Sequence, residues 1–418
     1  MKKEREATMD KATMEKPVAD QAGNGSRFDS GAGKRIETGN RGRVEATVAA
    51  PVHGFVAPGL EGLKDVFCGQ LAVGQHFGAQ LCVRKDGRVV AELWGGFADD
   101  ARTRPVREDT PFMAYSATKA LTAACVHRLA DQGLLELEAP AARYWPAFGR
   151  HGKDGITVMQ LLTHRAGIPA KASMADLVSW LWSPLAAARV AAMKPSYAPG
   201  SATVYHAFTA GTVLGELVRR VSGRSCARYL AEEFLAPLGM SSSHPGLPPR
   251  LYAKASGIYC ADPGQARAAA VFSNPALRSV FLPAASLNTT ALDLSLFYAM
   301  LAAGGEWEGR RYLSPEAFVR ATAPRYDGPD GDSGMRCRWA AGFGLGGYSP
   351  FEDADIRHMG RSSTERTFGH SGQGGCATGW ADPDSRLAFA FTCNRFLELK
   401  AAHRRLEELA DSCRAVLA

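Results

Sequence analysis

The sequence predicts a mixed α/β (α+β) fold, in which one antiparallel sheet is built from both chain ends and flanked by helices, with a mostly helical region inserted. Three observations support this fold class: strand-like runs near residue 80, helical patterns through the middle of the chain, and strand-like runs again in the last hundred residues. Strands, then helices, then strands indicate one shared sheet. We therefore expect a sheet region at about 53–115 and 300–418, and a helical region at about 116–299.

The folded part opens with a predicted β-hairpin. Residues 80–84 and 88–94 are short strand-like runs around Lys85-Asp-Gly87, and an Asp-Gly pair between such runs is typical of a tight turn. Next, Ala117–Ala130 contains no Gly or Pro and repeats apolar residues at helical spacing. We expect a helix there that ends near Asp131-Gln-Gly133.

Helices and then strands follow in the rest of the chain. Helical spacing predicts further helices at Val158–Leu162, Met174–Leu185, Thr209–Val221, Cys226–Leu235 and Ala291–Ala303. Towards the carboxyl end, Gly375–Ala381 and Leu387–Cys393 are strand-like runs. An apolar stripe over Leu399–Leu417 predicts a final helix.

The composition is typical of soluble globular proteins. The 418 residues allow one large domain or two to three smaller ones, and 46% hydrophobic with 22% charged residues excludes fibrous, collagen-like and wholly disordered chains. The 49 Lys and Arg against 42 Asp and Glu give a net charge of +7, but the positive residues are scattered, so we expect no nucleic-acid partner. No apolar run approaches the ~18 residues that cross a bilayer, so we expect no membrane partner.

The cysteines and the amino end bear on location. The chain has nine cysteines, widely spaced and without a Cys-x-x-Cys pair, which predicts reduced, mostly buried thiols and no metal site. The amino end leads into no apolar stretch of about 7–15 residues, as a secretory signal would. We therefore predict a cytoplasmic protein.

The first segment differs in composition from the rest. Residues 1–45 hold ten Lys and Arg, eight Asp and Glu and few large apolar residues, too few to offset the entropy lost on ordering. We predict a disordered tail over residues 1–52, followed by a single domain over 53–418.

One serine and one lysine have a spacing that suits catalysis. Lys119 is the only one of the 13 lysines with a serine three positions before it, in Ser116-Ala-Thr-Lys119 at the start of a predicted helix. Positions i and i+3 share a helix face, so the amine can approach the hydroxyl, and the helix start offers amides and a positive dipole to an oxyanion. The tetrad alone would equally suit a helix-capping serine beside a solvated lysine.

Further segments in order make a family resemblance specific. They are Leu-Leu-Thr-His at 161–164, the segment Pro199–Ala207 around Tyr205, Leu-Gly-Met at 238–240, and His370-Ser371-Gly372 within Phe368–Gly375. Together with Ser116-x-x-Lys119, they make the chain from about 60 to 395 resemble the serine β-lactamase-like family of class C β-lactamases, penicillin-binding proteins and D-aminopeptidases. The chain is most similar to the esterase branch, the family VIII carboxylesterases.

The resemblance implies a serine β-lactamase-like fold, a single catalytic domain and an acyl-enzyme mechanism without a cofactor. Ser116 would attack an acyl carbonyl, and Lys119 and Tyr205 would share the proton transfer. A nearby cation lowers a phenol pKa and desolvation lowers a lysine pKa, so the sequence leaves open which of the two is the base. The backbone amides of Ser116 and Gln373 would bind the oxyanion.

Departures from the β-lactamase pattern surround these residues. His370 replaces the usual lysine and would donate a hydrogen bond to the catalytic tyrosine or to substrate; a strand histidine facing a neighbour is the alternative. Ser371 and Gly372 would support substrate binding. An asparagine that holds the substrate amide lies two residues after the tyrosine in β-lactamases, where this chain has His206-Ala207. We expect His206 to pack or line the pocket.

These departures favour simple esters over β-lactams. We predict a serine hydrolase that cleaves carboxylic esters of small or medium acyl groups, with a small-molecule ester as partner and no cofactor. The alternatives are an acyltransferase that moves the acyl group to a metabolite alcohol, a β-lactamase, a D-amino-acid amidase or peptidase, and a non-catalytic binding protein. The sequence leaves the oligomeric state open.

Two motif searches argue against rival chemistries. Gly342–Gly347 matches G-x-G-x-x-G, but Tyr348-Ser-Pro follows instead of a helix, so we expect a glycine-rich strand entry and not a dinucleotide site. No G-x-S-x-G occurs, which excludes the nucleophile elbow of α/β-hydrolases.

Overall fold

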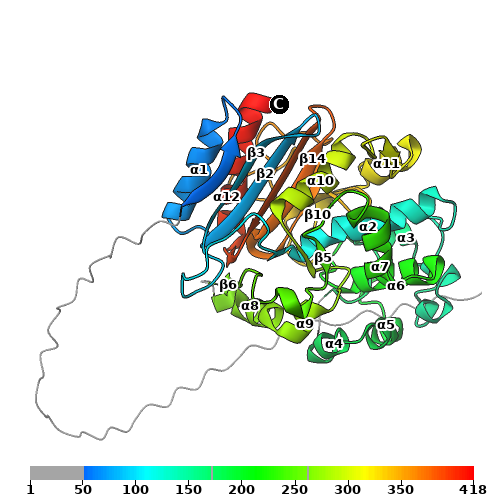
Figure 1. Ribbon diagram of the computed structural model, residues 1–418. Coiled ribbons are helices and arrows are strands. Elements are labelled where there is room, and N and C mark those ends of the chain that lie inside the picture. Colours follow the sequence, from blue (N-terminus) through cyan, green and yellow to red (C-terminus); the bar gives the residue numbers. More distant parts are fainter. Residues whose placement is uncertain (1–50, 171–172, 261–262) are drawn as a thin grey trace, which may run out of the picture. The chain divides into compact units, whose positions relative to one another are not determined.

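The computed structural model describes residues 51–170, 173–260 and 263–418. Within them the main sheet has nine strands in the order β1-β3-β2-β15-β14-β13-β12-β11-β10, each antiparallel to its neighbours (Figure 1). The strands are β1 (Val52–Val56), β2 (Gly78–Lys85), β3 (Arg88–Gly96), β10 (Tyr326–Pro329), β11 (Arg336–Trp339), β12 (Gly344–Leu345), β13 (Phe368–Ser371), β14 (Ala377–Asp382) and β15 (Leu387–Cys393). Early and late strands join where β2 pairs with β15, so the predicted fold class is confirmed.

Helices cover both faces of this sheet. They are α1 (Glu61–Ala72), α2 (Thr118–Asp131), α3 (Val158–Leu162), α4 (Met174–Ser179), α5 (Ser183–Ala192), α6 (Thr209–Ser222), α7 (Cys226–Leu230), α8 (Ala266–Ser273), α9 (Pro275–Ser279), α10 (Ala291–Ala302), α11 (Pro315–Thr322) and α12 (Leu399–Leu417). Helices α1 and α12 pack together on one face, and α10 packs on β15, β2 and β14 from the other. Figure 1 shows α2 to α7 gathered beside the sheet as the inserted helical region.

Strand β15 shows why the two faces take different helices. Its Phe389 and Phe391 join the apolar cluster that contains α1 and α12, whereas Ala388 and Ala390 join the cluster that contains α10. On neighbouring β14, a Cβ at Gly379 would lie 2.0 Å from the ring of Tyr298 on α10. Small residues on this face therefore let α10 approach the sheet closely.

Short strands tie the loops together. One small sheet has the order β4 (Phe112–Met113), β7 (Leu287–Thr289), β5 (His244–Pro245), and two pairs join β16 (Arg395–Phe396) to β6 (Tyr259–Cys260) and β8 (Glu306–Trp307) to β9 (Arg310–Arg311). The small sheet matters for function because β4 leads directly into the segment of Ser116.

Most predicted elements are confirmed, and two helices differ. The predicted helix Met174–Leu185 is two helices, α4 and α5. Pro184 has no N–H to bond a preceding carbonyl and is tolerated only in the first turn of a helix, so a new helix begins at Ser183. The predicted helix Cys226–Leu235 is α7 followed by a π-helical turn, Ala231–Leu235. Residues 342–347 enter β12, as expected for a strand entry.

The amino-terminal boundary falls slightly earlier than predicted. Val52 already pairs with Gly95 in the sheet, whereas residues 1–50 of the predicted tail lie outside the described residues. Six of the nine cysteines are buried, which confirms the prediction that most of them are. Among the described helices, none combines the length and apolar character that a membrane span requires.

A buried ion pair anchors α12 to the sheet. Arg414 donates hydrogen bonds to Asp382 Oδ2 (2.8 Å), Thr367 Oγ1 (3.1 Å) and Met359 O (2.8 Å). The two charged side chains are 2% and 6% exposed, so each depends on the other for compensation.

We expect Arg414→Met to lower the free energy of unfolding by about 3–5 kcal/mol, because the substitution leaves the carboxylate of Asp382 buried without its partner. Chemical denaturation measures this loss. The control is Arg366→Met, which removes the exposed Arg366–Asp384 pair and should cost at most about 1 kcal/mol. Equal losses in the two variants would contradict the view that the buried Arg414–Asp382 pair matters more for stability than an exposed pair.

Candidate active site

Ser116 lies in a strained turn at the start of a helix. The chain passes from β4 through a short 3₁₀ helix, Tyr115–Ala117, directly into α2. Tyr115 has a φ of 46°, in the left-handed region that few residues other than glycine adopt. Its buried ring packs edge-on against Phe272 and Phe396, with 5.2 Å between ring centroids in both pairs. Such strain concentrates at functional sites, and here it sets the position of the adjacent Ser116.

Lys119 is buried, at 8% exposure, and faces Ser116. Its Nζ lies 3.2 Å from Ser116 Oγ, 2.8 Å from Ala207 O and 3.0 Å from Ala284 O. A neutral amine has two N–H donors and one lone pair. Because the two carbonyls can only accept, they take the two N–H groups and leave the lone pair for the Ser116 hydroxyl. The arrangement therefore suits transfer of the serine proton to the amine.

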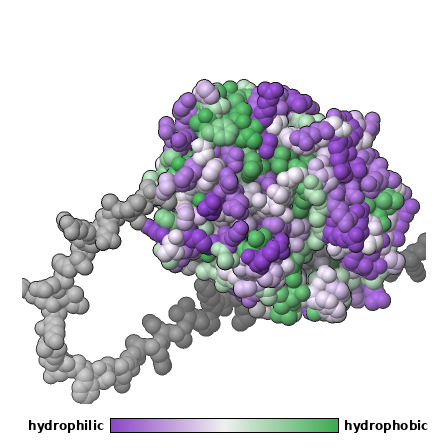
Figure 2. Space-filling view, viewed as in Figure 1, coloured by the Kyte–Doolittle hydropathy of each residue, from purple (hydrophilic) through white to green (hydrophobic). Residues whose placement is uncertain are grey.

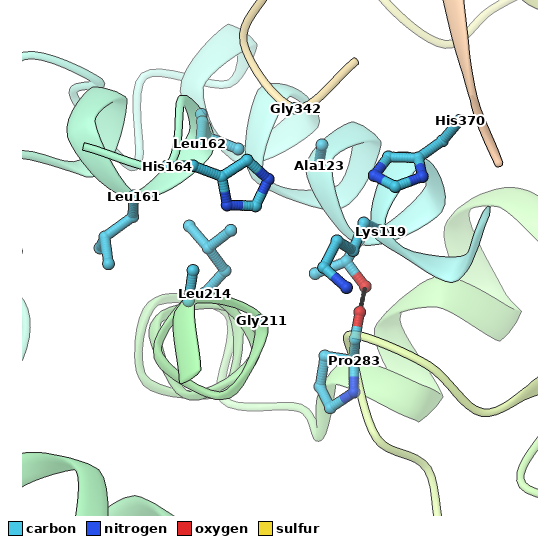
Figure 3. A pocket seen from close by; sticks show the side chains of 12 residues that line it. Lys119, Ala123, Leu161, Leu162, His164, Gly211, Leu214, Pro283, Gly342 and His370 are labelled. Carbon is cyan, nitrogen blue, oxygen red and sulfur yellow. Dashed lines mark hydrogen bonds between the residues drawn. The ribbon is translucent and has the colours of Figure 1, made fainter. Parts of the chain in front are cut away.

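A small cavity with mostly apolar walls lies beside Lys119 and makes the surroundings of its amine apolar. Its volume, counted as space open to the centre of a water molecule, is about 20 Å³, and Figure 3 shows Lys119, His164 and His370 at its edges among apolar side chains. The lining residues are Lys119, Thr122, Ala123, Leu161, Leu162, His164, Ala210, Gly211, Leu214, Pro283, Gly342 and His370. Burial in these surroundings lowers the pKa of Lys119 from 10.5 to about 7.

The pKa of Lys119 predicts the acid limb of the activity profile. We expect kcat/KM to rise with pH through about 7, because the amine accepts the Ser116 proton only in its neutral form, which predominates above that pKa. Burial lowers the pKa of His206 and His370 to about 4 and about 3, so neither histidine titrates in this window. Ester hydrolysis measured from about pH 5 to about pH 9 checks this. A flat profile across that range would contradict the assignment of Lys119 as the base.

Tyr205 lies in the segment before α6, with the Lys119 Nζ 5.0 Å from its ring centroid. Burial raises the pKa of the phenol, and a side-chain hydrogen bond with Ser116 offsets only part of that rise. The expectation that the lysine lowers this pKa is therefore wrong, because desolvation outweighs the influence of a neighbouring amine that itself loses its charge near neutral pH. The phenol keeps its proton at neutral pH and can donate it.

The predicted motif 370–372 ends strand β13 beside the Ser116 segment. A Cβ on Gly372 would lie 2.7 Å from Ala114 O and 3.0 Å from Tyr115 Cβ, so the absence of a side chain permits this contact. Gln373 then begins a 3₁₀ helix, Gln373–Gly375, and the first N–H groups of a helix have no acceptor within it. The same applies to Ser116 in its own 3₁₀ helix. The two predicted oxyanion donors thus lie in segments that contact each other at Gly372, and their binding of an oxyanion stays a prediction.

The side chains of this motif have other partners. His370 Nδ1 donates to Ser371 O (2.9 Å), which leaves Nε2 as an acceptor, and within the described residues this buried atom has no hydrogen-bond partner. Because Nδ1 donates to Ser371 O and Nε2 has no partner among the described residues, His370 makes no hydrogen bond to the Tyr205 phenol in this structure. A contact of His370 with substrate stays a prediction. Ser371 Oγ bonds Thr378 Oγ1 on β14 (2.9 Å), and the exposed Gln373 side chain donates to Gln265.

Residues that the sequence reasoning did not assign surround Tyr205. The ring of His164 lies 4.7 Å from those of both Tyr205 and Trp339, and the Tyr205 N–H donates to Asp330 Oδ2 (2.8 Å). His206 is fully buried and stacks on His164, so it packs as expected and does not line the cavity. The motif Leu-Leu-Thr-His at 161–164 contains His164, so the sequence marked this residue without indicating its role. No local pattern marked Asp330, because 125 residues separate it from Tyr205.

The described part of the chain contains no group of three or more His, Cys, Asp or Glu side chains arranged to hold a metal ion. The residues gathered around Ser116 are instead a hydroxyl, an amine, a phenol and neutral imidazoles. Such a set can support nucleophilic acyl transfer with internal proton donors and acceptors.

Comparisons with known proteins show which family this chain resembles. The β-lactamase family model matches residues 63–413. The esterase/β-lactamase LipL of Mycobacterium tuberculosis is 33% identical over 355 residues, which cover 78% of this chain and 79% of LipL. A solved family VIII carboxylesterase shares 32% identity at a TM-score of 0.75, covering 86% of this chain and 99% of its own. A penicillin-binding protein homologue from Caulobacter crescentus shares 31% identity at a TM-score of 0.75, covering 87% and 99%.

Proposed function

This chain belongs to the β-lactamase family of serine hydrolases, and from that premise we propose that it cleaves carboxylic esters of small or medium acyl groups through an acyl-enzyme on Ser116. The observation that carries the proposal is the environment of the Lys119 amine. In its neutral form the amine donates its two N–H groups to two backbone carbonyls and directs its lone pair at the Ser116 hydroxyl. A base held in this way raises the nucleophilicity of an otherwise weak hydroxyl.

In the acylation step, Ser116 Oγ forms a bond to the ester carbonyl carbon while Lys119 takes the hydroxyl proton. The tetrahedral intermediate then collapses with cleavage of the bond to the alcohol oxygen. The departing alcohol receives a proton from the Tyr205 phenol, which is replenished from the Lys119 ammonium. Backbone N–H groups of Ser116 and Gln373 stabilise the negative charge on the carbonyl oxygen.

Deacylation repeats these steps with water as the nucleophile. The neutral Lys119 amine accepts the proton of the attacking water, the bond between the acyl carbon and Ser116 Oγ breaks, and Ser116 regains a proton through Tyr205 from the Lys119 ammonium. The products are a carboxylic acid and free enzyme. An alcohol in place of water would give a new ester, which is the acyltransferase alternative.

Two substitutions relative to the β-lactamase pattern favour esters. Burial lowers the pKa of His370 to about 3, so at neutral pH it offers no positive charge to the carboxylate of a β-lactam, as a lysine would. Ala207, two residues after Tyr205, stands where the β-lactamases have their asparagine, and it has no side-chain amide to hold the substrate amide. Hydrolysis of β-lactams is the second candidate, because the name of LipL, the relative described above, combines esterase with β-lactamase.

Intact-mass detection of acyl-enzymes tests the proposal. The protein is mixed with acetate, butyrate and long-chain esters, a cephalosporin and a D-amino-acid amide, with and without added alcohols. We expect adducts and turnover with short esters, slow or no reaction with the cephalosporin, and no adduct in Ser116→Ala. Faster turnover of the cephalosporin than of every ester would favour the β-lactamase. Transesterified product formed at the expense of acid would favour the acyltransferase.

A further inference from the structure

We propose that His164 and Asp330 are positioning residues that grip the backbone on both sides of Tyr205 and thereby hold its phenol against Ser116. This inference rests on the proposed function, since it concerns the same catalytic tyrosine. Neither residue forms a hydrogen bond with Ser116 or Lys119 in the structure; both act through the segment that carries Tyr205.

Three consecutive N–H groups of this segment donate to tertiary partners. The Val204 N–H donates to His164 O (3.0 Å), the Tyr205 N–H to Asp330 Oδ2 (2.8 Å), and the His206 N–H to His164 Nδ1 (3.1 Å). In an extended segment, successive N–H groups point to opposite sides. His164 therefore takes the first and third from one side, and Asp330 takes the middle one from the other.

His164 adopts an unusual backbone conformation for this purpose. Its φ of 59° lies in the left-handed region, where the backbone oxygen and the ring of one residue can reach two amides of the same segment. Because Nδ1 accepts the His206 N–H, that nitrogen carries no proton, and burial lowers the pKa of His164 so that it stays an acceptor at neutral pH. The ring also packs 4.7 Å from the Tyr205 ring.

Asp330 is buried, at 8% exposure, in the turn between β10 and β11. Its Oδ1 accepts from Asp332 N (3.1 Å), Ser333 N (2.9 Å) and Ser333 Oγ (3.1 Å), so the carboxylate is fixed within its own turn and presents Oδ2 to Tyr205. The same turn donates from Gly331 N to Thr203 O (2.8 Å). We call His164 and Asp330 together the clamp. Through Asp330, the clamp connects the sheet to the segment of Tyr205.

Holding the phenol in place matters because a displacement of about 1 Å can cost a reaction about 100-fold in rate. The phenol interacts with the side chain of Ser116, and its ring centroid lies 5.0 Å from the Lys119 amine. Without the clamp, the segment before α6 has no regular secondary structure of its own to restrain it.

The first test is Asp330→Asn. The asparagine oxygen should stay with the three donors of the turn, which places its NH₂ against the Tyr205 N–H and breaks that single contact. We expect kcat and the rate of Ser116 labelling by a fluorophosphonate to fall about 10- to 100-fold, with KM for an ester within about twofold of wild type. Asp332→Asn, in the same turn and exposed, is the matched control and should leave both rates unchanged.

A double-mutant cycle separates positioning from a general structural role. In a Tyr205→Phe background, which has no phenol to position, Asp330→Asn should slow labelling by less than about twofold. An equal loss in both backgrounds, or no loss in the wild-type background, would overturn the proposal. Labelling needs no ester, so a protein that is labelled with this dependence but hydrolyses no ester would refute the proposed function and leave the clamp standing.

A pair of substitutions at His164 keeps the test decisive if Asp330→Asn does not fold. Asparagine tolerates a left-handed backbone and offers a side-chain oxygen as acceptor, whereas alanine offers none. We expect His164→Asn to retain most of the labelling rate and His164→Ala to lose about 10-fold or more. Equal labelling rates in these two variants would also overturn the proposal.

Discussion

Replacing Lys119 with methionine should lower kcat for ester hydrolysis by about 10²–10⁴-fold, the usual contribution of a general base. Methionine has a similar length and suits the apolar surroundings of the cavity, so the change removes the amine with little change in volume. Steady-state kinetics with a short ester, together with the rate of acyl-enzyme formation by mass, measures the loss. The loss should appear in acylation, where the Ser116 proton is removed.

The control for Lys119→Met is Lys153→Met. Lys153 is also buried and donates to backbone carbonyls, namely those of Arg150 (2.8 Å), Ala191 (3.0 Å) and Met193, but it has no hydroxyl partner among these contacts. The Lys153→Met variant should be less stable than the wild type, without a comparable loss of kcat per folded molecule. If both lysine variants lost activity alike, or if Lys119→Met kept more than about a tenth of wild-type kcat, Lys119 would not be the base.

Replacing Gly372 with alanine should lower kcat by about 10²–10³-fold, the effect of losing one oxyanion donor. The new Cβ would meet Ala114 O at 2.7 Å and Tyr115 Cβ at 3.0 Å, and both of these residues are buried. The end of β13 must then move away from the Ser116 segment and carry the Gln373 amide with it. Binding of a boronic-acid inhibitor that mimics the tetrahedral intermediate should weaken in parallel.

Gly155→Ala is the control for this prediction. A Cβ at Gly155 would have no atom within 4 Å, so the substitution should change neither stability nor kcat appreciably. If Gly372→Ala folds and keeps wild-type kcat, the oxyanion would have to be stabilised elsewhere. A loss confined to KM would indicate that Gly372 affects substrate binding and not the transition state.

Long elements with a strong pattern were predictable from the sequence, and short ones were not. The hairpin β2–β3, the strand β15 and the helices α2, α6, α10 and α12 follow from runs and periodicity within about 7 to 19 residues. The strands β10, β11 and β12 have four, four and two residues. They are strands because neighbouring strands supply their hydrogen bonds, and no local pattern encodes that pairing.

The sequence by itself determined which chemical groups this protein brings to its site. Ser116 and Lys119 are three residues apart, so any helix over this segment places the amine beside the hydroxyl. The order of the motifs around Tyr205 and His370 identified the family, and the family comparison confirmed it. These are properties of local spacing and residue type, which a sequence records directly.

Only the tertiary structure decided how these groups are tuned. The carbonyls that bind the Lys119 amine come from Ala207 and Ala284, 88 and 165 residues away, and the apolar cavity beside it comes from several helices. Burial therefore gives Lys119 a pKa of about 7 and raises that of Tyr205, which reverses the expectation for the phenol. Desolvation depends on everything packed around a group, and that packing exists only once distant segments have folded together.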